Sequence, residues 1–299
     1  MRVPPLEKDI IVRCLELFGE WSYNEVLLLS RLARRGDIFW DVGAFLGTFG
    51  LGFTQLVEIK QLVCVEANPF VYPYLQENLR RNCISPSIAV NAAVAAQAGT
   101  FAQEDKSITH IDNVGATRFS EYVGGRKEPV KGTTLRELRE AHGDYNILKL
   151  DIEGMETEAL LGDCDFIASR RPVLWIECNE NLASIGLLKV VRALNYSVIY
   201  VGFPAFRRNN FHRNHEPMFP LAYEAALLAG PKDRLGDFLN LAQSLDCIVR
   251  EVSNPDDLRQ ALWETPRWAD AGWLQLSRPE LIALLGRSVL SQEKTTFLE

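Results

Sequence analysis

The stretch that decides the fold of this 299-residue chain is Phe39-Trp40-Asp41-Val42-Gly43-Ala44-Phe45-Leu46-Gly47. Residues 38–42 are apolar apart from Asp41, as expected for a strand that is buried on both faces of a parallel sheet. Gly43 and Gly47 follow and allow the backbone to approach a ligand closely. Open α/β sheets bind nucleotide-like ligands at such a turn from a strand into a helix. The stretch therefore predicts an α/β fold with a ligand site at this turn.

The turn does not carry the dinucleotide-binding fingerprint Gly-x-Gly-x-x-Gly. Counted from Gly43, the next two glycine positions are occupied by Phe45 and Thr48. A pyrophosphate would therefore meet a phenylalanine side chain where the fingerprint offers bare backbone. The carboxylate of Asp41 also suits a cationic or hydroxyl-bearing ligand better than a phosphate.

Strand-like and helical segments alternate along the chain on both sides of this turn. Further strands are expected at residues 62–66, 88–94, 147–151, 173–177, 197–201, 222–229 and 247–252. Two short helices are expected before the first strand, over residues 7–17 and 26–32. Asn68 and Pro69 predict the start of a helix that runs to about Asn82. This alternation is typical of right-handed βαβ units and a parallel sheet.

Composition limits the class of protein and its partners. The formal net charge of -7 disfavours a broad nucleic-acid surface, so no nucleic-acid partner is expected. The six cysteines have no C-x-x-C spacing, which indicates reduced thiols and a cytoplasmic protein. No apolar run approaches the roughly 20 residues that a membrane span needs, and residues 1–21 do not form a secretory signal. The oligomeric state is left open.

Glu66 ends the second predicted strand and is a candidate ligand for a ribose. A carboxylate has two acceptor oxygens and can take both ribose hydroxyls. By itself, Glu66 is equally well explained as a solvated carboxylate at a strand end. Together with Asp41, Gly43 and Gly47, it indicates an adenosyl group without phosphates.

A third cluster of polar residues follows the strand at residues 147–151. This strand brings Asp151 to the carboxyl edge of the sheet, where ligands of open α/β sheets bind. Glu153 and Gly154 then turn the chain into the next helix. Glu156, and in part Glu153, also fit a simpler role, because acidic side chains stabilise helix N-termini.

Four segments in this order resemble the FkbM-type S-adenosylmethionine-dependent methyltransferases. They are Asp41-Val42-Gly43-Ala44 with Gly47, Val65-Glu66-Ala67-Asn68-Pro69, Asn91-Ala92-Ala93-Val94, and Leu148-Lys149-Leu150-Asp151-Ile152-Glu153-Gly154 with Glu156. The resemblance covers roughly residues 22–230. It implies a Rossmann-like class I methyltransferase fold: a seven-stranded, mostly parallel sheet with helices on both faces, and residues 222–229 as an inserted antiparallel strand.

The resemblance also divides the chain. Residues 1–36 are expected to form an N-terminal helical extension, and residues 37–230 the S-adenosylmethionine-binding domain. Residues 231–299 are expected to form a C-terminal α/β extension, to which no role is assigned.

The resemblance implies which residues bind the cofactor. Asp41, Gly43, Ala44 and Gly47 are expected near its methionine part, and Glu66, Ala67 and Asn68 near its ribose. Ala93 and Val94 are expected near the adenine, and Asp151 near the sulfonium. Family members often have a histidine where this chain has Met155; if that histidine assists proton removal in relatives, this chain must use another group or a different acceptor. Asp151 and Glu153 are the first candidates for that catalytic role, and His110 and His212 are weaker ones.

The implied reaction is methyl transfer, with S-adenosylhomocysteine as product, to a hydroxyl of a sugar or another small metabolite. Glu177 is expected to line the acceptor pocket; a magnesium ion on Asp151, Glu177 and Asn179 is an alternative, and no metal is assigned. In the segment 203–220, Arg207, Arg208 and His212 lie among aromatic residues. That segment is expected either to be a lid that recognises an anionic acceptor or to be a solvated loop.

Two rival functions stay open. One is a catalytically silent S-adenosylmethionine-binding partner protein. The other is an N-methyltransferase that acts on a different acceptor.

Overall fold

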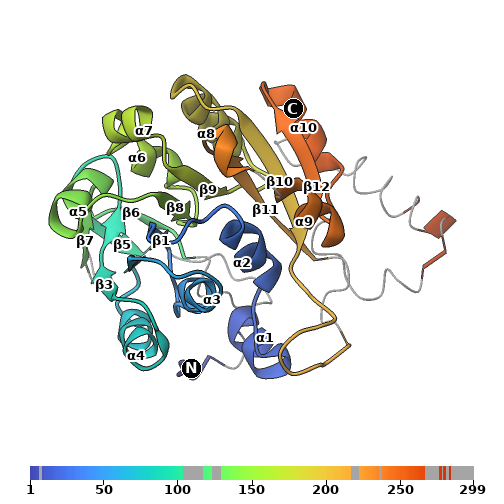
Figure 1. Ribbon diagram of the computed structural model, residues 1–299, viewed down its shortest axis with the longest axis horizontal. Helices are drawn as coiled ribbons and strands as arrows, with labels where there is room; N and C mark the ends of the chain where they lie inside the picture. The colour runs from blue at the N-terminus through green and yellow to red at the C-terminus, as the bar shows by residue number, and fades with distance from the viewer. Residues whose placement is uncertain are drawn as a thin grey trace.

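A computed structural model describes residues 1–6, 9–103, 117–122, 129–216, 222–235, 238–266, 276–277, 279–280 and 283. Two sheets and the helices around them make up this part of the chain (Figure 1). His110, one of the weaker candidate bases, lies outside the described residues. None of the described helices is long and apolar enough to cross a membrane.

The main sheet has eight strands in the described part of the chain. Their bounds are β1 Ile38–Val42, β2 Gln61–Glu66, β3 Ser87–Asn91, β8 Ile147–Leu150, β9 Val173–Glu177, β10 Val198–Pro204, β11 Tyr223–Ala229 and β12 Ile248–Val252. Their spatial order is β12-β10-β11-β9-β8-β1-β2-β3. The five neighbouring strands β9, β8, β1, β2 and β3 pair in parallel, whereas β11 is antiparallel to both of its neighbours.

This order confirms the class I methyltransferase fold and the predicted antiparallel strand at residues 222–229. The expected count of seven strands is one too low, because β12 adds to the edge of the sheet through antiparallel pairing with β10. The main sheet therefore continues beyond residue 230.

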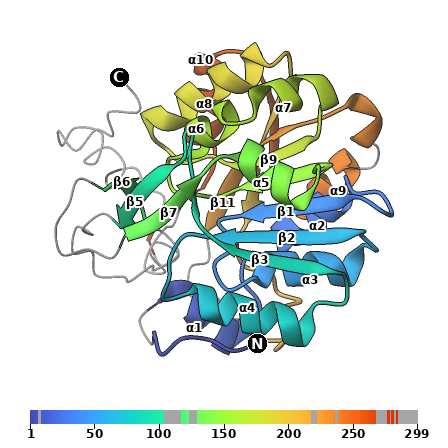
Figure 2. The same cartoon turned by 90° about the vertical axis from the view of Figure 1, so that its left-hand side faces the viewer.

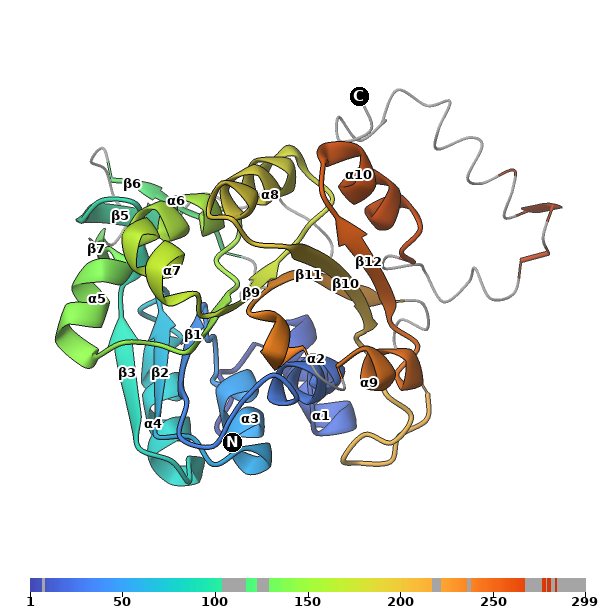
Figure 3. The same ribbon diagram turned by 45° about the horizontal axis from the view of Figure 1, so that its top comes forward.

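Helices cover both faces of the main sheet, as Figure 3 shows. One face carries α2 Tyr23–Ser30, α3 Thr48–Leu56, α4 Tyr72–Asn82 and α9 Phe238–Ser244, with α1 Ile10–Phe18 packed beside them. The other carries α5 Leu135–His142, α6 Glu156–Leu161, α7 Cys164–Arg170, α8 Leu182–Ala193 and α10 Pro255–Trp263. A 3-10 turn, η1, covers Lys232–Arg234. Side chains alternate between the two cores, so Trp40 and Val42 face the second set of helices and Phe39 faces the first.

The expected strand at residues 88–94 is two strands in different sheets. β3 ends at Asn91, and Ala93–Val94 form β4 of a small sheet with β5 Gly99–Gln103, β6 Phe119–Glu121 and β7 Pro129–Thr133. The break lies at Ala92, whose N–H donates to the carbonyl of Glu66. Figure 2 shows the small sheet beside one end of strands β1–β3. Because β4 follows β3 directly, this is the carboxyl end.

The helix predicted to begin at Asn68 and Pro69 begins later. The Asn68 side chain accepts a hydrogen bond from the N–H of Phe70 and forms a local turn, and α4 starts at Tyr72. Asn68 therefore shapes the turn after β2 instead of capping α4.

The carboxyl ends of β1 and β8 approach each other closely at Gly43. The N–H of Asp151 donates to the carbonyl of Val42, and the N–H of Gly43 donates to the carbonyl of Val65. Gly43 has a φ of 87°, and a Cβ at this position would lie 1.7 Å from the carbonyl oxygen of Asp151. This glycine is therefore required for two reasons, backbone conformation and contact with the strand that carries Asp151.

Gly43→Ala is expected to destabilise the protein by at least about 3 kcal/mol, because the side chain meets backbone that has no room to shift. Gly36→Ala is the matched control. Gly36 has a similar φ of 85°, but a Cβ added there would have no described atom within 4 Å, so its cost is the backbone strain of about 1 kcal/mol. Urea unfolding of both variants measures the difference. Equal costs would contradict the close approach of β1 and β8.

Candidate functional site

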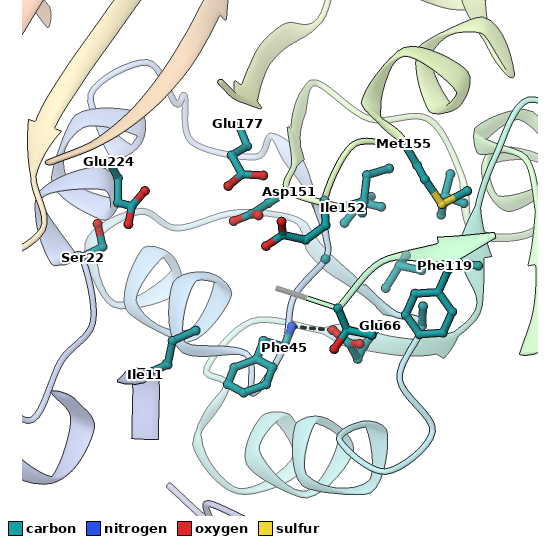
Figure 4. A pocket seen from close by; sticks show the side chains of 18 of the residues that line it. Ile11, Ser22, Phe45, Glu66, Phe119, Asp151, Ile152, Met155, Glu177 and Glu224 are labelled. Atoms are coloured by element: carbon teal, nitrogen blue, oxygen red, sulfur yellow. Dashed lines mark hydrogen bonds between the residues drawn. The ribbon is translucent and has the colours of Figure 1, made fainter. Parts of the chain in front are cut away.

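A cavity opens at the carboxyl ends of the central strands. Its walls come from the ends of β1, β2, β8 and β9, from β4 and β6 of the small sheet, and from the segment around α1 and α2 (Figure 4). The cavity has an apolar end near Glu66 and Phe119, and Ser22 and Glu224 lie at the opposite end.

At the first end, Glu66 is held by two backbone amides. The N–H of Phe45 donates to Oε2 at 2.8 Å, and the N–H of Asn68 donates to Oε1 at 2.7 Å. Phe45 adopts a φ of 48°, which is unusual for a residue with a side chain and turns this N–H toward Glu66. The Glu66 carboxylate therefore has a fixed orientation, and each oxygen keeps a lone pair for a further donor.

Burial raises the pKa of Glu66 to about 7, although the two amides act in the opposite direction. Asn91 fixes the turn that follows Glu66, because its side-chain amide donates to the carbonyls of Glu66 and Ala67. The expected ribose ligand is thus a buried and oriented carboxylate, and the simpler interpretation as a solvated surface group is wrong.

Small and apolar side chains form the wall beside Glu66. Ala67, Ala92, Ala93 and Val94 line the cavity, together with Phe119 of β6 and Met155 before α6. Such a wall suits a flat apolar ring. The sequence analysis did not identify Ala92, Thr117 or Phe119 as site residues. Thr117 and Phe119 lie just before and at the start of β6, and the small sheet that contains β6 was not expected.

The turn after β8 directs acidic side chains into the cavity. Glu153 and Gly154 both have positive φ angles, 56° and 101°. Glu156 accepts hydrogen bonds from the N–H groups of Ile152 and Gly154, both at 3.1 Å, so it stabilises the turn that precedes α6. Asp151 and Glu153 line the cavity.

Three carboxylates converge in the middle of the cavity. Oxygen atoms of Asp151, Glu153 and Glu177 all lie within 4.8 Å of one another. Burial, followed by repulsion from Asp151 and Glu156, raises the pKa of Glu153 to about 8. Burial and repulsion from Asp151, Glu153, Glu156 and Glu224 raise the pKa of Glu177 well above its ordinary range. The cluster therefore favours either protonated carboxyl groups or a bound cation.

A buried lysine forms an ion pair with one carboxylate of this cluster. Lys149 is 3% exposed, and its Nζ lies 2.7 Å from Oδ2 of Asp151. Burial lowers the pKa of Lys149, but attraction to Asp151, Glu25 and Asp41 outweighs it and raises the pKa above its ordinary value. Glu25 also accepts a 2.6 Å hydrogen bond from the Trp175 indole. The lysine thus joins α2, β1 and β8 through charge.

The segment around α1 and α2 forms one wall of the cavity, which the sequence did not reveal. Ile11, Trp21, Ser22 and Glu25 all line it. Glu224 and Phe203, at the paired ends of β11 and β10, complete the wall next to Glu177. An acidic residue at the start of the inserted strand is a signal that could have identified Glu224. Nothing in the local sequence marks Ser22.

The predicted anion-binding residues of the segment 203–220 do not line the cavity. Arg207 forms a bidentate ion pair with Glu20, at 2.7 and 2.5 Å, and its guanidinium lies over the Tyr23 ring. The ring of His212 hydrogen-bonds the carbonyl of Glu16 at 3.1 Å. Arg208 is exposed. The described part of this segment holds the N-terminal helices in place, and the expectation that Arg207 and His212 recognise an acceptor is corrected.

Of the other predicted residues, Gly43, Glu66, Ala67, Ala93, Val94, Asp151, Glu153 and Glu177 line one cavity. Asp41, Ala44, Gly47 and Asn68 lie behind its wall. Asp41 is fully buried, accepts a hydrogen bond from the N–H of Gly50, and faces Lys149. Its position is explained by strand alternation, since Asp41 pairs in register with Lys149 on the same face.

Comparison with known families assigns the chain. A family model described as the methyltransferase FkbM domain matches residues 41–207, which is more than half of the chain. The chain belongs to the FkbM methyltransferase family. A search of curated proteins found no match.

Solved structures that resemble this FkbM family member share little sequence identity with it. A methyltransferase FkbM from Methylobacillus flagellatus KT has 17% identity and a TM-score of 0.45, over 72% of this chain and 50% of that one. This chain thus spans about half the length of that protein. A precorrin-6y C5,15-methyltransferase from Geobacter metallireducens GS-15 has 13% identity and a TM-score of 0.40, over 69% and 86% of the two chains.

Lys149→Met is expected to destabilise the protein by roughly 3–5 kcal/mol, because it leaves buried carboxylates without their cation. The loss should be larger at pH 8 than at pH 5. Burial already raises the pKa of Asp41 to about 6 and that of Glu25 to about 7, and without the lysine the folded protein holds these protons more tightly. The unfolded chain releases them above about pH 4, so stability falls as the pH rises.

Urea unfolding at the two pH values measures the effect, and Lys60→Met on the surface is the control, with an expected change within about 0.5 kcal/mol. A pH-independent loss in Lys149→Met would show that the lysine does not compensate these carboxylates.

Proposed function

We propose that this FkbM family member is an S-adenosylmethionine-dependent methyltransferase that methylates a hydroxyl oxygen of a sugar or another small metabolite. The observation that carries the proposal is a single cavity with an oriented carboxylate, Glu66, at one end and the Asp151–Glu153–Glu177 cluster beyond it. One end suits an adenosine, and the other offers groups that handle a proton. The two are joined by the turn at Gly43.

The residues present fit the cofactor. Glu66 would accept both ribose hydroxyls, and the wall of Ala92, Ala93, Val94 and Phe119 would contact the adenine. Gly43 lines the cavity with bare backbone, where a methionine chain would pass. Asp41 would act indirectly, through Lys149 and the start of α3. When bound, the cofactor supplies an activated methyl group on a sulfonium.

The protein's own groups then align the acceptor and accept its proton. Alignment of the two reactants supplies most of the acceleration in a displacement of this kind. Glu153 is the proposed proton acceptor, because Asp151 is held by Lys149 and Met155 has no basic atom. Asp151 would orient the acceptor hydroxyl. No metal is included in this assignment.

We also propose that the protein is cytoplasmic and has no nucleic-acid partner. All six cysteines are free thiols, which fits a reducing compartment.

Glu66→Gln is expected to weaken S-adenosylhomocysteine binding at least tenfold. The glutamine has an NH₂ group where Glu66 has an oxygen, and that group would face the N–H of Phe45 or of Asn68. Calorimetry on the wild type and the variant measures the change, and Glu158→Gln, exposed on α6, is the control. If the wild type binds no S-adenosylhomocysteine, the proposed function is wrong.

Methyl transfer should depend on pH through Glu153. A base must be deprotonated, so a pKa of about 8 predicts a rate that falls about tenfold per unit below pH 8 and levels off above it. Glu153→Gln should remove this dependence and lower the turnover about 10²- to 10⁴-fold. Transfer of labelled methyl groups to an accepted sugar, measured from pH 6 to 9, tests both. An unchanged profile in the variant would exclude Glu153 as the base.

The silent-partner alternative predicts tight S-adenosylhomocysteine binding without transfer to any acceptor. A panel of sugars, nucleotide sugars and hydroxylated lipids, assayed with labelled methyl donor, separates it from the enzyme.

A further inference from the structure

The acceptor end of the cavity is acidic, and its described lining contains no lysine, arginine or histidine. The acidic residues that line the whole cavity are Glu25, Glu66, Asp151, Glu153, Glu177 and Glu224. In the assignment above, Glu66 serves the ribose and Glu25 is bonded to Trp175. Lys149 offsets the charge of Asp151, so Glu153, Glu177 and Glu224 remain as the acidic groups of the acceptor end. Burial and mutual repulsion raise the pKa of Glu153 and of Glu177, so a bound cation stabilises their ionised forms and a bound anion destabilises them.

A separate observation indicates a missing hydrogen-bond partner at the same end. Ser22 is 3% exposed, and its Oγ has no hydrogen-bond partner within the described residues. Ser22 lines the cavity, and Figure 4 draws its hydroxyl directed toward Glu224. A buried hydroxyl without a partner is costly, so a ligand donor at this place would be favourable. Its φ of 45° is also a strained conformation for a serine, which is typical of a functional position.

Two further features concern the occupant of this end. Trp21 and Phe203 line the cavity, so part of its surface is aromatic and suits the carbon skeleton of an organic ligand. The arginine expected to attract an anion, Arg207, is already paired with Glu20.

We propose that the acceptor is an amino alcohol or amino sugar. Its ammonium group binds among Ser22, Glu177 and Glu224, and its hydroxyl faces Asp151 and Glu153. The inference rests on the proposed function and specifies its substrate class. The ammonium donates to Ser22 Oγ and to the carboxylates, so it satisfies the buried hydroxyl and stabilises the ionised forms of the clustered carboxylates.

The same arrangement selects the oxygen for methylation. Carboxylates around an amine keep it protonated, and a protonated amine has no lone pair with which to attack a methyl group. The hydroxyl oxygen instead attacks the methyl carbon, a C–O bond forms, and the C–S bond breaks with its electron pair left on sulfur. The hydroxyl proton passes to Glu153. The products are S-adenosylhomocysteine and an O-methyl ether whose ammonium group is not methylated.

The test uses matched pairs of acceptors that differ only in charge. The 299-residue chain is saturated with S-adenosylhomocysteine. Calorimetry then compares glucosamine with N-acetylglucosamine and with glucose. It also compares small amino alcohols and aminocyclitols with their N-acetyl derivatives. Amines should bind at least tenfold more tightly than their acetylated partners. With labelled S-adenosylmethionine, mass spectrometry of the product should place the methyl group on oxygen.

Variants at the far end of the cavity locate the effect. Glu224→Gln and Ser22→Ala should each reduce the preference for amines about tenfold while S-adenosylhomocysteine binding stays unchanged, which also shows that the variants fold. Glu251→Gln, an equivalent change on the exposed face of β12, is the matched control and should keep the preference.

Three outcomes would overturn the inference. One is that acetylated or anionic acceptors bind as tightly as the matching amines, so that no matched pair differs in affinity. The second is an N-methylated product. The third is a divalent cation as the occupant: Mg²⁺ or Mn²⁺ binds without an amine, and a chelator abolishes transfer. In each case intact S-adenosylhomocysteine binding would leave the proposed cofactor in place, whereas loss of that binding in the wild type would refute the proposed function itself.

Discussion

The ammonium group of Lys149 inside the sheet is the charge on which the rest of the site depends. Its Nζ lies 2.7 Å from Asp151 and 5.2 Å from the centre of the Phe49 ring, with almost no contact with solvent. A buried ammonium is tolerated only when opposite charges surround it. Asp151, Asp41 and Glu25 provide them from β8, β1 and α2. The lysine therefore fixes the side chain of Asp151 at the point where the two ends of the cavity meet.

The N-terminal helices are part of the site for the same electrostatic reason. Glu25 of α2 contributes to the charge around Lys149, and the ion pair of Glu20 with Arg207 fastens the turn between α1 and α2 to the segment after β10. Between these two attachments lie Trp21 and Ser22, which form the far wall of the cavity. Substitutions at Glu20 or Arg207 should therefore affect the acceptor more than the cofactor.

Much of the fold and of the end of the cavity around Glu66 followed from local sequence. The apolar strand before Gly43, the carboxylate at the end of β2 and the turn at Asp151 each lie within a few residues of the signal that identifies them. The strand at residues 247–252 was predicted, but its place as the eighth strand of the main sheet was missed, because nothing local shows that β12 pairs with β10. The role of Arg207 was misjudged because sequence cannot distinguish an arginine that awaits an anion from one already paired with Glu20. Ser22 and Glu224 meet only through tertiary structure, more than 200 positions apart in the chain.

The acidic cluster explains why the two halves of the cavity differ in chemistry. Glu66 is oriented by backbone amides and is suited to neutral hydroxyl donors. Asp151, Glu153 and Glu177 repel one another at close range and are suited to a cation or to proton transfer. The two ends of one cavity are therefore suited to different ligands, a nucleoside near Glu66 and an acceptor near Asp151, Glu153 and Glu177.

The most direct test of this account is a crystal structure of the protein with S-adenosylhomocysteine. The account predicts both ribose hydroxyls on the Glu66 carboxylate, the adenine against Ala93, Val94 and Phe119, and the sulfur directed toward Asp151 and Glu153. A ligand bound elsewhere, or a ribose that does not contact Glu66, would contradict it.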